Sequence, residues 1–171
     1  MHRIDYPAMY RRVRANKNLV LFLRAAHTVS VILVVLAFLS YVAHCAFSVS
    51  YIYAISILAV SAVPFVTVSA LRKLLGCPRP YEVMDFAELG IEPPRRGRRD
   101  SFPSRHTFSA FLIGSLAVFD LPILGAAVLV LSVYLALTRV LLGYHFIRDV
   151  VVGAVIGTIT GVTGAICLMI F

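Results

Sequence analysis

Two histidines and one carboxylate are the groups of this chain best suited to form and break a covalent bond. His145 precedes Asp149 by four residues, and His106 ends the segment 103–106 (PSRH). A spacing of four residues places two side chains on the same face of a helix. A carboxylate that holds one ring nitrogen of a histidine fixes its tautomer. The other nitrogen is then free to attack an electrophile such as phosphorus.

Arg139 lies six residues before His145 and could bring a guanidinium to the same place, because Gly143 permits a tight reversal of the chain between them. A guanidinium fork matches phosphate oxygens, so Arg139 would hold a phosphate while His145 approaches the phosphorus. In the alternative interpretation, Arg139, Arg148 and Asp149 form an ion pair that only holds two helices together. Ionisable groups at membrane depth are costly and functional by default, which favours the chemical interpretation.

His106 lies at the predicted start of another helix. Ser101 is the expected N-cap, and Pro103 falls in the first turn. The free backbone N–H groups at such a helix start suit a phosphate. His106 would then be placed to protonate a leaving oxygen. The alternative is a histidine that caps a helix or packs at an interface.

Three further cations, Arg72, Lys73 and Arg79, follow a long apolar segment. Their donors could bind phosphate oxygens in pairs. Taken alone, this cluster is better explained as ordinary positive charge at the end of a membrane span.

The elements that must position these residues are membrane-spanning helices. Hydrophobic residues make up 60% of the 171 residues and charged residues 14%, whereas about a quarter of a soluble domain is charged. Five segments approach or exceed the ~20 apolar residues that cross a bilayer: 19–47, 50–75, 102–119, 121–142 and 146–171. Lipid offers no partner for free backbone groups, which forces these segments into helices. We expect an all-α polytopic transmembrane helix bundle, with residues 1–171 as a single domain.

Polar segments and glycines add detail to this arrangement. Residues 1–17 carry arginines beside tyrosines and predict an amphipathic helix at the membrane surface. Residues 76–101 predict a polar loop, irregular in its Pro- and Arg-rich part, which could cover a site. Four glycines give the last span a small-residue face for close packing, namely Gly153, Gly157, Gly161 and Gly164.

Positive charge gathers on one side of this bundle. With five spans, all sixteen Lys and Arg residues lie on the side of residues 1–17 and 76–101, or in the adjoining helix ends. The positive-inside rule predicts that this side, with all three clusters, faces the cytoplasm. Charge beside a bilayer attracts anionic headgroups, so the net charge of +8 does not indicate nucleic-acid binding. The three cysteines show no metal-binding spacing, and no carboxylate cluster suits Mg²⁺.

The clusters together resemble the type 2 phosphatidic acid phosphatase superfamily, whose pattern is Lys-x6-Arg-Pro, Pro-Ser-Gly-His and Ser-Arg-x5-His-x3-Asp. The chain matches at Arg79-Pro80, at Pro103-Ser104-x-His106 and at Arg139-x5-His145-x3-Asp149, in order and spacing. The resemblance covers roughly residues 50 to 170. Three positions depart from the pattern. Arg72 stands at the family lysine with Lys73 one position later, Arg105 replaces the glycine, and Thr138 replaces the serine.

The resemblance implies a role for each matched residue. His145 would be the nucleophile, Asp149 its orienting carboxylate, and His106 the general acid that later helps to activate water. The phosphoryl group would be bound by Arg72 (or Lys73), Arg79, Ser104 and Arg139, and Arg105 could contact the headgroup. No metal or other cofactor is implied.

The implied activity is hydrolysis of a lipid phosphate or pyrophosphate in the inner membrane of a bacterial cell. Undecaprenyl pyrophosphate, phosphatidylglycerophosphate and phosphatidic acid are the expected substrate class. Arg105 and the run 95–99 (RRGRR) favour the pyrophosphate, because they could meet a second phosphate. An alternative is a non-catalytic membrane protein that binds lipid phosphates. Family members that recycle lipid carriers work on the extracytoplasmic face, in conflict with the orientation that the charges predict. The oligomeric state stays open.

Overall fold

The fold is an all-α bundle, as the sequence predicts. A computed structural model describes residues 5–84 and 99–170, which form helices and no strand. The helices are α1 (Tyr6–Ala15), α2 (Lys17–Ser48), α3 (Tyr51–Leu75), α4 (Pro80–Val83), α5 (Arg105–Asp120), α6 (Pro122–Leu141) and α7 (Ile147–Ile170). Four stretches of the described chain are long and apolar enough to cross a membrane: Lys17–Ser48, Tyr51–Val83, Pro122–Leu141 and Ile147–Ile170.

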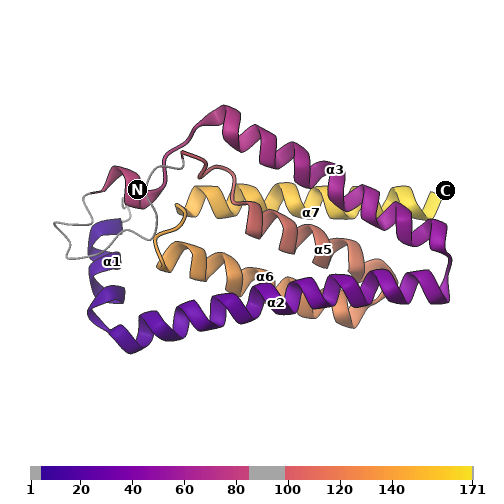
Figure 1. The fold of residues 1–171 in the computed structure, drawn as a ribbon, viewed down its shortest axis with the longest axis horizontal. Helices are drawn as coiled ribbons and strands as arrows, with labels where there is room; N and C mark the ends of the chain where they lie inside the picture. Colours follow the sequence, from indigo (N-terminus) through magenta and orange to yellow (C-terminus); the bar gives the residue numbers. More distant parts are fainter. Residues whose placement is uncertain (1–4, 85–98, 171) are drawn as a thin grey trace.

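The predicted third span, residues 102–119, is the one that differs. Its helix, α5, begins at Arg105 rather than Phe102 and has 16 residues, a length of about 24 Å. It lies at the centre of the bundle, packed against α2, α3, α6 and α7 (Figure 1). A helix that buries its surface on neighbouring helices does not need the long apolar exterior of a lipid-facing span.

Glycines allow α7 to approach α5 closely, as the small-residue face predicts. A Cβ atom at Gly157 would lie 2.4 Å from the carbonyl oxygen of Phe108, and one at Gly161 would lie 2.5 Å from that of Leu112. Both distances are far shorter than a van der Waals contact. The two helices therefore pack backbone to backbone, and this contact fixes α7 relative to α5.

All three sequence clusters lie at the same end of the bundle. This end holds the last turn of α3, the first turns of α5 and α7, and the last turn of α6, on the left of Figure 1. α1 lies across it, with Tyr10 and Val13 buried against Tyr81, Leu142 and Tyr144. The apolar face of the predicted surface helix therefore packs against the protein.

The opposite end of the bundle is tied together by Asp120 at the end of α5. Its carboxylate accepts hydrogen bonds from the hydroxyls of Tyr41 in α2 and Tyr53 in α3, the latter at 2.9 Å. Buried Cys45 and Leu116 pack beside this cluster. The cluster joins α2, α3 and α5 at the end farthest from the candidate site, and α2 and α3 diverge from it toward the other end (Figure 1).

Candidate active site

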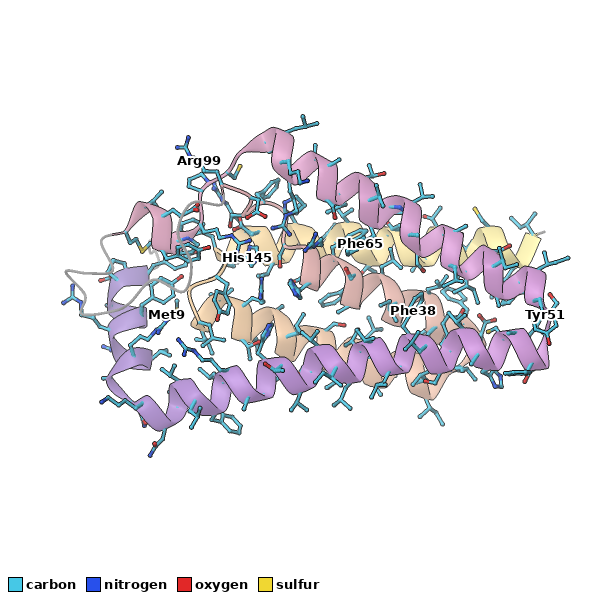
Figure 2. All side chains as sticks on the ribbon, in the orientation of Figure 1. Met9, Phe38, Tyr51, Phe65, Arg99 and His145 are labelled. Carbon is cyan, nitrogen blue, oxygen red and sulfur yellow. The ribbon has the colours of Figure 1, made fainter. Side chains whose placement is uncertain are left out.

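A polar cavity of about 550 Å³ opens at the end of the bundle where the clusters meet. Figure 2 shows His145 near this end, while Phe65 and Phe38 lie farther along the bundle and Tyr51 lies at the opposite end. The cavity draws on α2, α3, α4, α5, α6 and the turn after α6. Its lining residues are Arg24, His27, Arg72, Arg79, Tyr81, Asp100, Arg105, His106, Arg139 and Tyr144.

His145 lies between Asp149 on one side and Arg139 on the other. It precedes α7 rather than starting it, because Gly143 with φ of 75° turns the chain and the His145 amide bonds the Arg139 carbonyl. The predicted pairing is confirmed in space: His145 Nδ1 lies 3.5 Å from Asp149 Oδ2. On the other side Arg139 Nη2 donates to His145 Nε2 at 3.2 Å.

Hydrogen bonds define the tautomer of His145. The Ser101 hydroxyl donates to Asp149 Oδ2 at 2.5 Å, so its oxygen is left to accept from His145 Nδ1 at 3.3 Å. The guanidinium of Arg139 can only donate, so His145 Nε2 must carry a lone pair. The proton is therefore on Nδ1, toward the carboxylate. The nitrogen that faces the guanidinium is the one with nucleophilic character.

Ser101 has a different place from the one predicted. The N-cap of α5 is Ser104, because the helix begins at Arg105. Ser101 is fully buried and holds the carboxylate of Asp149 instead. A Phe-Pro pair separates it from the helix start, and the residue before a proline is disfavoured in the helical region.

Burial lowers the pKa of His145 from 6.5 to about 4, because the side chain has no contact with water that could solvate its charge. Arg139 lowers this pKa further, whereas the hydrogen bond with Asp149 opposes both effects. His145 is therefore neutral at pH 7, which is the state a nucleophile needs.

The guanidinium of Arg139 contacts two histidines from different parts of the bundle, His145 before α7 and His27 of α2. Nη2 contacts His145, Nη1 contacts His27 Nε2 at 3.3 Å, and the plane lies over the ring of Tyr144 at 4.9 Å. Its Nε is buried and has no hydrogen-bond partner among the described residues. A buried donor without a partner is costly, and an anion in the cavity would supply one.

Arg72 and Arg79 form a second cationic group, held by Asp100. Arg79 donates to Asp100 Oδ1 from Nε at 3.1 Å and from Nη2 at 2.8 Å. Arg72 lies 3.4 Å from Asp100 Oδ2 and also donates to its backbone carbonyl. Two of the predicted phosphate ligands thus already hold a carboxylate. Lys73 is exposed and does not line the cavity, so the structure brings Arg72 to the site and leaves Lys73 outside it.

The remaining predicted residues come from the start of α5. His106 and Arg105 line the cavity, and Arg105 lies over the ring of Phe65 at 5.3 Å. Ser104 is buried, with its hydroxyl 3.0 Å from that of Thr107, so the structure does not bring this side chain into the cavity. Most of the run 95–99 lies outside the described residues, apart from exposed Arg99.

Sequence reasoning missed the contribution of α2. Arg24 and His27 line the cavity, and His27 contacts Arg139 and Thr138. The signal was present in the sequence, since both are ionisable residues one turn apart near the start of a long apolar segment. No group of three His, Cys, Asp or Glu side chains in the described part of the chain could hold a metal ion.

Residues 46–169 match the family model of the PAP2 superfamily. The chain belongs to this superfamily. The match includes all three clusters and agrees with the resemblance seen in the motifs. No match was found among curated proteins, and none among solved structures.

Membership of the PAP2 superfamily supports phosphatase-type activity on phosphoesters and a membrane location. The geometry of the cavity is consistent with this class. Guanidiniums line the cavity, and His145 lies directly behind one of them, Arg139, with Asp149 on its far side. His145 and Asp149 are fully buried and are not among the lining residues.

Proposed function

We propose that this protein is an integral-membrane lipid phosphatase that hydrolyses a phosphomonoester or pyrophosphate headgroup through a phosphohistidine on His145. The observation that carries the proposal is the set of hydrogen bonds around His145, from which its tautomer follows. The Nδ1 proton points to Ser101 and Asp149, and the Nε2 lone pair points to Arg139 at the cavity wall.

Substrate binding would expose the nucleophile. Phosphate oxygens accept from guanidinium groups more strongly than a neutral imidazole does, because they carry charge. A phosphoryl group in the cavity would therefore draw the Arg139 N–H groups away from His145 Nε2. The lone pair that Arg139 now covers would be released at the moment when an electrophilic phosphorus is present.

In the first chemical step, His145 Nε2 forms a bond to phosphorus while the bond from phosphorus to the leaving oxygen breaks. Burial and the nearby guanidiniums lower the pKa of His106 in the empty cavity, and the charge of a bound phosphoryl group would raise it, so that His106 takes up a proton as substrate binds. His106 then gives this proton to the leaving oxygen, and Asp149 stabilises the positive charge that develops on the His145 ring. Arg72, Arg79 and Arg139 compensate the charge on the phosphoryl oxygens.

In the second step, water attacks the phosphorus of the phosphohistidine and His106 takes up the proton that the water loses. The nitrogen–phosphorus bond breaks, and its electron pair returns to His145 Nε2. Inorganic phosphate leaves, and both histidines regain their starting protonation states.

Two apolar pockets beside the cavity support a lipid as the substrate. The first, of about 240 Å³, includes Arg105 and His106 in its lining and is otherwise mainly apolar, with Val31, Val34 and Phe65. The second, of about 270 Å³, shares Phe65 with the first and continues to Phe38 and Leu58. Together they form a groove between α2 and α3, above α5, where Figure 1 shows these two helices diverging. A headgroup at His106 would have its hydrocarbon chain in this groove.

The candidate substrates are undecaprenyl pyrophosphate, phosphatidylglycerophosphate and phosphatidic acid. The alternative, a protein that binds lipid phosphates without hydrolysis, would predict a lost nucleophile or acid. Both His106 and His145 are present, and the hydrogen bonds around His145 suit attack. Hydrolysis is therefore favoured.

The test is phosphate release from these three lipids by purified protein in detergent, with EDTA present. We expect release by the native protein and none by His145→Ala. His44→Ala is the matched control, since His44 is an exposed histidine of α2 outside the cavity. A radiolabelled phosphoryl group should be trapped on the native protein in an alkali-stable form and be absent from His145→Ala. Binding of all three lipids without release would contradict the proposal.

A further inference from the structure

One face of α2 runs from the polar cavity into the apolar groove. Arg24 and His27 contribute to the cavity, Val31 and Val34 to the first pocket, and Phe38 to the second. The spacings of three and four residues place all five side chains on the same side of the helix. The two residues nearest the cavity are ionisable, although the rest of this face is apolar. Neither has a role in the reaction described above.

We propose that Arg24 of α2 and Arg105 of α5 form a second anion subsite, beside His27, that binds the inner phosphate of a lipid diphosphate. The inference rests on the proposed function and deepens it, because it assigns the substrate class and the residues that select it. The scissile terminal phosphate lies against Arg139 and His145, and the inner phosphate lies between His106 and the groove.

The order of residues along the cavity places the second anion on the leaving-group side. His145 marks the scissile phosphorus, and His106 marks the leaving oxygen. Arg105 and His106 line both the polar cavity and the apolar groove, so they stand at the junction between headgroup and hydrocarbon chain. An anion bound by Arg105 therefore belongs to the part of the substrate between the broken bond and the chain. In a lipid diphosphate, that part is the inner phosphate.

The balance of charge also indicates more than one phosphate. Five guanidiniums line the cavity, and Asp100 is the carboxylate among its lining residues. Asp100 pairs with Arg72 and Arg79. Arg24 and Arg105 make no ion pair with a carboxylate in the described part of the chain. One phosphoryl group carries a charge of about −1.5 to −2, so a monophosphate would leave these two cations uncompensated.

Hydrogen bonds around His27 place the two subsites next to each other. The Thr138 hydroxyl donates to the Leu135 carbonyl at 2.8 Å, so its oxygen accepts from His27 Nδ1 at 3.3 Å. His27 Nε2 therefore accepts from Arg139 Nη1. Because Arg139 Nη2 contacts His145, the two amino groups of one guanidinium face the two subsites. Anions held so close together match a diphosphate, in which a single oxygen joins the phosphorus atoms.

The test compares farnesyl diphosphate with farnesyl monophosphate, which share one hydrocarbon chain, as substrates of the purified protein in detergent. The measured quantity is the ratio of kcat/KM for the diphosphate to that for the monophosphate. We expect this ratio to fall about 10- to 100-fold in Arg24→Gln and in Arg105→Gly, as when a charge-assisted hydrogen bond is lost. Lys17→Gln removes a positive charge from an exposed position of α2 outside the cavity and should leave the ratio unchanged.

The outcomes separate this inference from the proposed function. Release from both lipids, with a ratio that neither variant changes, would overturn the second subsite and leave the lipid phosphatase standing. No release from either lipid by the native protein would instead count against the proposed function. Arg24→Lys keeps the charge and should retain most of the native ratio, whereas a loss equal to that of Arg24→Gln would contradict a role for that charge.

Discussion

At the scale of single residues, the protonation of His145 can be observed before any substrate is added. Its pKa is lowered to about 4 by burial, so the free imidazole should stay neutral from pH 7 to about pH 5. ¹⁵N NMR of the ring nitrogens in detergent should show a protonated Nδ1 and an unprotonated Nε2 over this range. His145→Ala assigns the signals, and a midpoint near 6.5 would contradict the prediction.

The same lowered pKa has a consequence for stability, with a definite sign. Between pH 6.5 and about 4, His145 is protonated in the unfolded chain but not in the folded protein. The free energy of unfolding therefore falls as the pH falls through this window. Above pH 6.5 His145 is neutral in both states and does not lower the free energy of unfolding.

Asp100 holds the guanidiniums that a substrate phosphate needs, and we predict that it competes with substrate. Its carboxylate pairs with Arg72 and Arg79 in the cavity and repels an incoming phosphate. Asp100→Asn should lower the KM for lipid phosphate about fivefold, equivalent to ~1 kcal/mol for a partly exposed ion pair. Inhibition by inorganic phosphate should strengthen in parallel. If the KM rises instead, Asp100 serves to position the two arginines.

At the scale of elements, the contact between α5 and α7 sets the distance between the acid and the orienting carboxylate. His106 lies in the first turn of α5 and Asp149 in the first turn of α7. The Ser104 amide also donates to the Asp149 carbonyl at 2.9 Å, which joins the two helix starts directly. Any change that separates the helices should therefore disturb the site as well as the fold.

Gly157→Leu tests this coupling. Its Cβ would overlap the Phe108 carbonyl, and overpacking of this kind costs about 1–3 kcal/mol. We expect a lower midpoint of thermal unfolding in detergent, together with a loss of phosphate release. Val155→Leu changes an exposed position of the same helix and is the matched control. Equal unfolding midpoints for the two variants would show that the helices do not depend on the glycine.

The sequence predicted the spans, the turn before α7 and the contact between His145 and Asp149 because the signals for these features are local. Apolar length predicts a span, Gly143 predicts a turn, and the four-residue spacing of His145 and Asp149 predicts their contact. Ser101 was assigned wrongly because its partner, Asp149, lies 48 positions away along the chain. Arg24 and His27 were missed because helical periodicity shows which residues share a face but not which neighbour that face meets.

At the scale of the whole molecule, the bundle is polarised along its axis. The described Lys and Arg residues lie at the end that holds the cavity or in the helix ends beside it. The opposite end has the turn between α2 and α3, the turn at Asp120 and the end of α7. Membrane insertion retains positively charged segments on the cytoplasmic side. The cavity should therefore face the cytoplasm, and its substrate would be a biosynthetic intermediate of the inner leaflet.

Cysteine labelling in intact cells tests this orientation with two exposed positions of α2, Asn18 at the cavity end and Ser48 at the other. Exposed Cys167 and partly exposed Cys77 would first be replaced by serine. A membrane-impermeant maleimide should label Ser48→Cys and not Asn18→Cys, and permeabilised cells should label both. The reverse pattern would place the cavity outside the cytoplasm. The positive-inside rule would then not explain why the arginines lie at this end of the bundle. Binding of an anionic substrate would be the remaining explanation.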